Sequence, residues 1–299
     1  MPTSRTSSIA SVVVSSFVWG TSFAVSKLAL RSIPPLWLAW IRFVLASAIL
    51  FVWLLVRHGD LRLDRRTFGA MLLGGVLGYT LNHIFENVGL ALSTASEISL
   101  MMGAFPVLSL LVEGLVYHRK FSRATVAGIV ISVVGIILIV DPRSLRGAPG
   151  GRRLLGDGLV ILSGICWAFY SILVKNLSRD SSAGRTAMFQ MLLGSVVLLP
   201  LAGIFERPTF PIPVSAVWAV IYLAVFCSVG GYSLYNYGVA GMTSTQAISI
   251  LNLIPVFGVL TSWVVLHETV TMMQLAGGAV VLLGVLLSLR DSSPVASPS

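Results

Sequence analysis

Four polar or aromatic side chains lie close together within one apolar stretch of the chain. They are Tyr79, Asn82, His83 and Glu86. Their spacings of three, one and three residues place them on the same face of a helix. Such a polar face predicts contact with an aqueous cavity or with protein, because polar groups are costly in hydrocarbon. The chemistry expected of it is hydrogen bonding and ring packing against a small molecule.

Further candidates of the same kind lie in other apolar stretches. They are Trp19, Trp167, Tyr232, Asn236 and Asn252. Together the two sets combine aromatic walls, amides and few fixed charges, which suits a small zwitterion or a neutral amphipathic molecule. An ammonium can rest on aromatic faces, and a carboxylate can bind backbone amides at a broken helix. The alternative for the two tryptophans is a place in the aromatic belt at the membrane surface.

Two prolines and two glutamates mark where helices are expected to break or move. Pro106 and Pro255 lie inside apolar spans at equivalent positions, and each removes one backbone hydrogen bond. The freed carbonyls must face protein or a water-filled cavity; the alternative is a packing kink without a ligand. Glu86 and Glu97 flank a short turn, and their role is open between an interfacial position and gating.

Composition places the chain in a lipid bilayer. Of its 299 residues, 56% are hydrophobic and 10% are charged, and its mean hydropathy is +0.92. Soluble domains contain roughly 25% charged residues. The uncharged runs are long enough to span hydrocarbon. The net charge of +9 comes from lysines and arginines between these runs, so it predicts contact with lipid headgroups and no nucleic-acid partner.

No motif indicates a catalytic, metal or cofactor site. The four histidines and two cysteines show no HxxxH or CxxC spacing, so we expect no metal site. The chain also lacks GxSxG, HExxH and paired carboxylates at suitable spacing. We therefore expect no cofactor and no enzymatic activity.

The chain contains one unit twice. Residues 87–140 align without a gap with residues 236–289, and a one-residue gap extends the alignment over nearly the whole chain. Gly128 and Gly135 align with Gly277 and Gly284. Each pair is seven residues apart, on one helical face, and predicts close packing of two helices.

The sequence predicts ten apolar spans, five in each copy of the unit. They are residues 9–29, 36–56, 68–88, 94–117, 124–140, 154–174, 186–205, 214–237, 242–266 and 272–289. Because five crossings are an odd number, the second copy enters the membrane from the opposite face. The predicted fold is an all-α integral membrane protein with ten transmembrane helices, arranged as two inverted five-helix repeats around a central cavity. An inverted pair can alternate between inward-open and outward-open shapes.

The repeat also divides the chain into regions. Residues 1–140 are the first repeat, 141–153 a linker, 154–290 the second repeat and 291–299 a disordered tail. More lysines and arginines lie on the side that holds the N-terminus, which predicts both termini in the cytoplasm and a multi-pass protein of the inner (plasma) membrane.

Several motifs carry a resemblance to a known family. They are the duplicated unit, the proline-interrupted fourth and ninth spans, RFVLA from Arg42, and the ending LHETVTMMQLAGGAVVLLGVLL. With them the whole chain resembles the EamA-type transporters of the drug/metabolite transporter superfamily, and among these it is most similar to the YddG-like exporters of aromatic and neutral amino acids. Glu268 occupies the place of the family's glutamate before the last helix, whereas the first copy has Arg119 and Lys120 there.

This resemblance implies ten helices, cytoplasmic termini and a central cavity walled by the first, third, fourth, sixth, eighth and ninth helices. Carried onto this sequence, the cavity wall would include Trp19, Tyr79, His83, Trp167, Tyr232 and Asn252.

We expect a secondary transporter that exports aromatic or neutral amino acids, or related small metabolites, and that functions as a monomer. One alternative is a multidrug or quaternary-ammonium exporter. Residues 9–29 contain no carboxylate, which counts against the mechanism of the small four-helix drug antiporters. An integral-membrane enzyme and a sensor or scaffold are the remaining alternatives. Any proton sensitivity is expected to pass through His83, the mid-span side chain that titrates nearest neutral pH.

Overall fold

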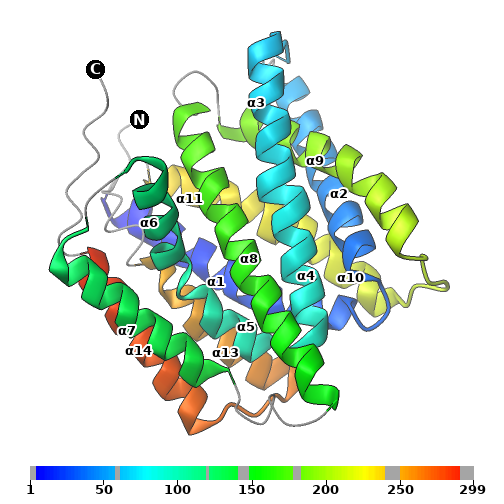
Figure 1. The fold of residues 1–299 in the computed structure, drawn as a ribbon. Helices are drawn as coiled ribbons and strands as arrows, with labels where there is room; N and C mark the ends of the chain where they lie inside the picture. The colour runs from blue at the N-terminus through cyan, green and yellow to red at the C-terminus, as the bar shows by residue number, and fades with distance from the viewer. Residues whose placement is uncertain are drawn as a thin grey trace.

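The computed structural model describes residues 5–57, 61–118, 121–140, 148–177, 183–239 and 250–289. Every regular element in these residues is a helix (Figure 1). The first are α1 (Arg5–Ala29), α2 (Pro35–Val56), α3 (Arg65–Gly75), η1 (Val76–Leu81), α4 (Asn82–Leu92), α5 (Ala95–Met102), α6 (Phe105–Val116) and α7 (Arg123–Ile139). They are followed by α8 (Ala148–Leu177), α9 (Ala183–Phe205), α10 (Val214–Tyr222), η3 (Leu223–Gly230), α11 (Gly231–Val239), α13 (Leu253–Leu266) and α14 (Met272–Leu289). The predicted all-α class is confirmed for this part of the chain.

Six helical stretches are long and apolar enough to cross a membrane. They are Thr6–Ala29, Pro35–Val56, Thr67–Leu92, Gly151–Leu173, Gly184–Phe205 and Val214–Tyr235. A seventh candidate is the pair α5 and α6, which is bent by 44° at a short break, and α7, α13 and α14 are shorter apolar helices. The chain is therefore a multi-span membrane protein, and the count of ten crossings stays a prediction. The predicted span 242–266 begins in residues outside the described part.

Large apolar side chains cover much of the outer surface. Trp218 and Trp263, for example, are 65% and 62% exposed. In water such a surface would favour association, whereas in a bilayer it contacts lipid chains. Polar side chains such as Asn82 and Gln190 are buried instead, which is the arrangement expected of a protein surrounded by hydrocarbon.

Two of the long spans contain a π-helical segment near their middle. η1 separates α3 from α4, and η3 separates α10 from α11. A π turn holds an extra residue, so a backbone carbonyl becomes available to another partner. Trp19 of α1 binds to η3, because its Nε1 donates a hydrogen bond to the carbonyl oxygen of Cys227 at 3.0 Å.

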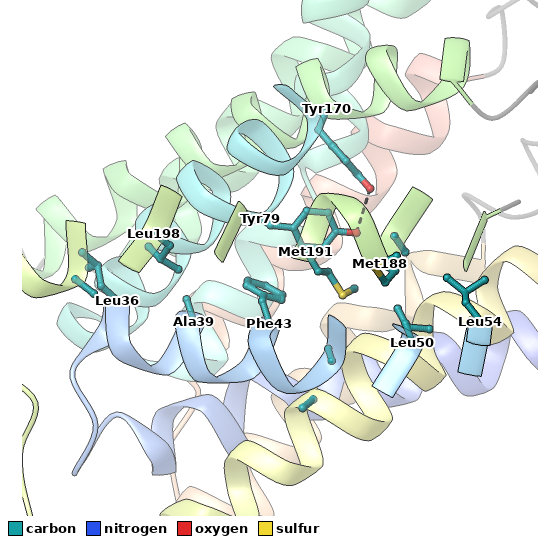
Figure 2. Packing of buried hydrophobic residues seen from close by; sticks show 14 residues of the cluster. Leu36, Ala39, Phe43, Leu50, Leu54, Tyr79, Tyr170, Met188, Met191 and Leu198 are labelled. Carbon is teal, nitrogen blue, oxygen red and sulfur yellow. Dashed lines mark hydrogen bonds between the residues drawn. The ribbon is translucent and has the colours of Figure 1, made fainter. Parts of the chain in front are cut away.

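The core that positions the site is formed mainly between α2 and α9. Figure 2 shows its buried side chains, which are Leu36, Ala39, Phe43, Leu50 and Leu54 from α2, Met188, Met191 and Leu198 from α9, and Tyr79 and Tyr170 from η1 and α8. Because these side chains fill the space between the helices, the polar groups near Phe43 and Tyr79 sit on a packed framework.

Close packing of α7 on α14 confirms the prediction from the glycine spacing. The two helices lie side by side at one edge of the protein (Figure 1). A Cβ atom at Gly128 would lie 2.5 Å from the carbonyl oxygen of Gly284, and one at Gly135 would lie 2.8 Å from that of Gly277. Only residues without a side chain permit so short a separation of the backbones.

Candidate functional site

Two residues of the predicted polar face, Tyr79 and His83, are buried beside α2. Their rings are parallel, with centroids 6.3 Å apart. Phe43 of α2 meets both rings edge-on, with centroid distances of 5.2 Å to Tyr79 and 4.5 Å to His83. A separation of four residues places Tyr79 and His83 on one side of their span. The contacts with Phe43 show that this side faces α2.

A chain of phenol groups extends from Tyr79 to α9. The hydroxyl oxygens of Tyr79 and Tyr170 are 3.3 Å apart, and Tyr170 donates to Oε1 of Gln190 at 3.2 Å. Nε2 of Gln190 is buried without a hydrogen bond within the described residues. The ring of Tyr232 lies 6.2 Å from that of Tyr79. The cluster is therefore aromatic, polar and not fully saturated in hydrogen bonds.

Arg42 supplies a fixed positive charge to this cluster. It is only 6% exposed, its Nε donates to Oγ of Ser228 at 2.9 Å, and its guanidinium lies 5.4 Å from the centre of the Phe43 ring. It is near enough to His83 and to the buried Glu86 for their charges to interact. A guanidinium carries five N–H donors, and Ser228 is its only acceptor within the described part of the chain.

Two tryptophans border the cluster from different helices. Trp19 packs on Tyr232 and Tyr235, at 5.2 Å and 5.4 Å between centroids, and Trp167 packs on Tyr170 at 5.2 Å. A Cβ at Gly231 would lie 2.5 Å from Nε1 of Trp19, so this glycine makes room for the indole. We name Trp19, Arg42, Phe43, Tyr79, His83, Glu86, Trp167, Tyr170, Gln190, Ser228 and Tyr232 the aromatic centre.

The three candidate asparagines do not join the aromatic centre in the described residues. Nδ2 of Asn82 donates to the backbone oxygen and to Oγ of Ser163, both at 3.0 Å, and so ties α4 to α8. Asn252 is half-buried and immediately precedes α13. The side chain of Asn236, in α11, lies outside the described part of the chain.

Both candidate prolines lie in the first turn of a helix. Pro106 follows the 44° bend between α5 and α6, and Pro255 is the third residue of α13. The helix interruption therefore precedes each proline, because the first turn has no internal acceptor for the missing N–H. The expected break is present at Pro106, and its role in gating stays a prediction.

Glu97 lies in a second polar group, at one end of the protein. It is 0% exposed and forms an ion pair with Arg153 of α8, in which Nε and Oε2 are 2.6 Å apart. Oγ of Ser93 lies 3.1 Å from Oε2 of Glu97 and 2.8 Å from Oδ1 of Asp157. The predicted gating residue thus holds α5 against α8.

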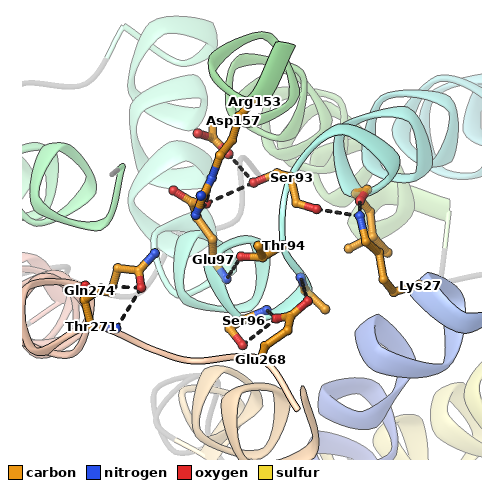
Figure 3. A network of polar contacts seen from close by, with 12 residues as sticks. Lys27, Ser93, Thr94, Ser96, Glu97, Arg153, Asp157, Glu268, Thr271 and Gln274 are labelled. Carbon is orange, nitrogen blue, oxygen red and sulfur yellow. Dashed lines mark hydrogen bonds and ion pairs between the residues drawn. The ribbon is translucent and has the colours of Figure 1, made fainter. Parts of the chain in front are cut away.

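Two further charged side chains bind the helix ends beside Glu97. Nζ of Lys27 donates to the carbonyl oxygens of Leu90, at 2.6 Å, and Ser93, at 2.5 Å. Glu268 accepts from the backbone N–H groups of Ala95, at 3.0 Å, and Ser96, at 2.8 Å. These charges oppose the helix dipoles at the end of α4 and the start of α5. We name Lys27, Ser93, Glu97, Arg153, Asp157 and Glu268 the polar seam (Figure 3).

Sequence reasoning missed several members of both groups. Tyr170 follows Trp167 by three residues, so its place on the same helical face was available as a signal. Gln190 aligns with Arg42 in the repeat, and both are polar within apolar spans. Asp157 is a charged residue within the predicted apolar span 154–174, and this was its signal in the sequence. Within the described ranges, no three His, Cys, Asp or Glu side chains lie close enough to hold a metal ion.

Comparisons with known proteins agree with a membrane transporter. The model of the EamA-like transporter family matches residues 6–141 and again residues 154–290. An uncharacterized transporter of Archaeoglobus fulgidus is 28% identical, over 91% of this chain and 93% of its own. A protein of Salmonella typhimurium named a probable amino-acid metabolite efflux pump is 26% identical, with 91% of each chain covered. The uncharacterized inner membrane transporter YedA of Escherichia coli is 28% identical, over 94% of this chain and 92% of its own.

A solved crystal structure also matches, with a TM-score of 0.68 and 20% identity over 97% of this chain and 100% of that one. This likeness supports the fold alone. The two family matches together cover most of the sequence. The chain belongs to the EamA-like transporter family.

Proposed function

We propose that the protein is a secondary transporter that exports aromatic or neutral amino acids, or related small metabolites, across the inner membrane. The observation that carries this proposal is the buried guanidinium of Arg42, which bonds only Ser228 within the described residues. A guanidinium with free donors binds a carboxylate through paired hydrogen bonds. The rings of the aromatic centre would pack against the substrate's side chain, and Glu86 would offer a partner to its ammonium.

Alternating access between two inverted five-helix repeats is the proposed mechanism. Contacts between α1 and α11 resemble those between α8 and α4. Oγ of Ser15 donates to the carbonyl oxygen of Gly231 at 2.8 Å, as Asn82 bonds Ser163 at the aligned positions. A Cβ at Gly238 would lie 2.7 Å from the oxygen of Ser8, and one at Gly89 would lie 2.7 Å from that of Gly156.

The contact between α7 and α14 supports the inversion most directly. Gly128 meets Gly284, and Gly135 meets Gly277. An early residue of one helix thus faces a late residue of the other, so the two helices are antiparallel. Exchanging the aligned residues turns one contact into the other, which is the pattern of a two-fold interface. This pattern is the one expected if the repeats have opposite orientations in the membrane.

The proposed organisation follows the sequence repeat. Residues 1–140 and 154–290 would each supply five spans, and both termini would be cytoplasmic. The linker predicted at 141–153, whose last six residues form the start of α8, would lie outside the cytoplasm. The family model matches each of the two long segments separately. In this orientation the polar seam lies at the exterior end, since Lys27 is at the end of α1 and Arg153 is near the start of α8. The central cavity is proposed at the aromatic centre. A monomer would contain both this cavity and the polar seam.

A second candidate substrate is a quaternary ammonium compound. The buried carboxylate of Glu86 and the rings near it favour this reading, because aromatic faces attract cations. The two candidates differ in the group that Arg42 would bind, since a quaternary ammonium dye has no carboxylate.

The test is transport in proteoliposomes with a labelled panel of threonine, methionine, phenylalanine, tryptophan, lysine and a quaternary ammonium dye. We expect neutral and aromatic amino acids to be carried, and Trp167→Ala to reduce the rate about tenfold by removing a ring beside Tyr170. Trp218→Ala is the matched control, because this indole lies on the outer surface and its loss should leave the rate unchanged. Transport of the dye alone would overturn the amino-acid proposal.

A further inference from the structure

The polar seam contains a hydrogen-bond arrangement that needs an added proton. Oγ of Ser93 lies 2.8 Å from Oδ1 of Asp157 and 3.1 Å from Oε2 of Glu97. A serine hydroxyl has one hydrogen, and an ionised carboxylate has none. If both carboxyl groups were ionised, one of these two contacts would join oxygens with no hydrogen between them.

Of the two carboxyl groups, Asp157 is better placed to hold such a proton, which would put the proton-sensitive group in the polar seam and not at His83, where the sequence led us to expect it. Glu97 already has the positive charge of Arg153 against it. Asp157 is only 1% exposed, and its Oδ2 has no hydrogen-bond partner within the described residues. Protonated at Oδ1, Asp157 donates to Ser93, and Ser93 in turn donates to Glu97. Every close contact around the hydroxyl then has one hydrogen.

The charged groups around Asp157 favour a proton over a metal cation. Arg153 lies one helical turn earlier on α8, Lys27 reaches in from α1 to the backbone of Ser93, and Glu97 and Glu268 face the same region from α5 and from the loop after α13. Two cationic side chains already neutralise the two glutamates. A sodium ion would meet both positive charges at close range, whereas a proton adds its charge directly to the carboxyl group.

We propose that Asp157, Ser93 and Glu97 form a proton-binding site that closes the exterior gate of the transporter when it is occupied. The site joins the two repeats, because Ser93 and Glu97 belong to the first and Asp157 to the second. Loss of the proton leaves a buried negative charge on Asp157 that the ion pair of Glu97 and Arg153 does not neutralise, and the contact between α8 and α5 opens so that water can reach this charge. The structure described above is then the proton-bound form, closed at this end. This inference rests on the proposed transport function, because a gate has a role only in a protein that transports a substrate.

The gate can be tested without any substrate. Leu92 borders the site, because a Cβ at Gly156 of α8 would lie 2.9 Å from its Cβ. We would replace Leu92 by Cys in full-length protein that carries Cys166→Ala and Cys227→Ala, and measure its reaction rate with a membrane-impermeant maleimide in liposomes. The same reporter in Asp157→Asn, which mimics the protonated acid, corrects for titration of the thiol itself.

We expect the corrected labelling rate to be about tenfold higher at pH 8 than at pH 5, and the Asp157→Asn protein to label slowly at both pH values. In Glu97→Gln the midpoint of this response should move by about one pH unit to lower pH, because the neighbouring negative charge is gone. Glu206→Gln, which removes a carboxylate outside the polar seam, should respond like the parent. Equal thermal unfolding midpoints of the parent and Asp157→Asn would confirm that both are folded.

Three results would overturn the proposal. They are a parent protein whose corrected labelling does not depend on pH, an Asp157→Asn protein that responds to pH like the parent, and labelling that slows with sodium chloride but not with potassium chloride at constant pH. The last result would identify a sodium site. A pH-dependent gate in a protein that carries none of the panel would leave the proton site standing and refute only the proposed substrate.

Discussion

The polar seam and the aromatic centre bury polar groups in two different ways. In the seam, Lys27 and Glu268 each bind backbone groups at a helix end, and Glu97 is held in an ion pair. In the centre, Arg42 keeps donors free and Nε2 of Gln190 has no partner within the described residues. Groups with all their hydrogen bonds made stabilise a helix contact, whereas groups with unmade hydrogen bonds are available to a ligand. Within the described residues, the group of the second kind in the seam is Oδ2 of Asp157, at the proposed proton site. The difference separates the side chains that stabilise helix contacts from those that we propose to bind the substrate.

The largest effect on stability is expected from Glu268→Ala, in the polar seam. The substitution removes charged hydrogen bonds to two backbone N–H groups and leaves those donors buried. The free energy of unfolding should fall by about 3 kcal/mol. Thermal unfolding in detergent, followed by circular dichroism, measures the change.

Glu113→Ala is the control for this variant. Glu113, in α6, makes no side-chain hydrogen bond or ion pair within the described residues, so its loss should change stability by less than about 0.5 kcal/mol. Equal losses in the two variants would mean that the seam is no more stabilising than an ordinary carboxylate.

Arg42→Gln should affect transport and leave stability nearly unchanged. The side chain keeps a donor for Ser228 but loses the charge proposed to bind the substrate's carboxylate. We expect transport of phenylalanine to fall about 10- to 100-fold, which corresponds to a lost charge-assisted hydrogen bond. Arg42→Lys should recover part of the rate. A variant that transports normally, or one that unfolds as easily as Glu268→Ala, would remove the distinction between the two regions.

The smallest effect is expected from Glu206→Gln. This variant tests whether a carboxylate that caps a helix outside the polar seam stabilises the protein as Glu268 does. Oε2 of Glu206 accepts from the N–H of Leu36 at 2.9 Å, at the start of α2. Burial raises the pKa of Glu206, although the N–H groups of Leu36 and Trp37 partly oppose this. The folded state therefore binds the proton more strongly, and this group's contribution to stability falls as pH rises through its folded pKa.

The variant should lack this contribution, so the parent's stability should decrease more than the variant's as the pH rises from 4 to 7. Thermal unfolding midpoints across this range measure the difference. Identical pH profiles would show that the surroundings of Glu206 do not perturb its titration in the folded protein.

Much of the framework could be predicted from the sequence, because it depends on local spacing. Gly128 and Gly135 lie seven residues apart and pack as expected, and Tyr79 and His83 share a side of their span. Asn82 was placed on the same face, yet it bonds Ser163 of α8. The packing of the helices and the π segment that ends at Leu81 decide which residue lies beside Asn82. A regular helical period predicts neither of them.

The partners of charged residues could not be predicted, because they come from distant parts of the chain. Glu97 was expected at an interface or in a gate, and nothing near it in sequence indicates Arg153 or Asp157. The alignment of Arg42 with Gln190 did indicate that both are polar at equivalent positions. Which helix each of them faces depends on how the spans pack, and that information is spread over the whole sequence.

The distribution of indoles gives the protein a built-in optical probe. Trp218 and Trp263 face outward, where brominated lipid chains would reach and quench their fluorescence, while Trp19 and Trp167 are packed against tyrosines inside. In a brominated bilayer, the emission that survives would come mostly from the interior. Binding of a non-fluorescent substrate could then be followed in the native chain, without a label or a substitution.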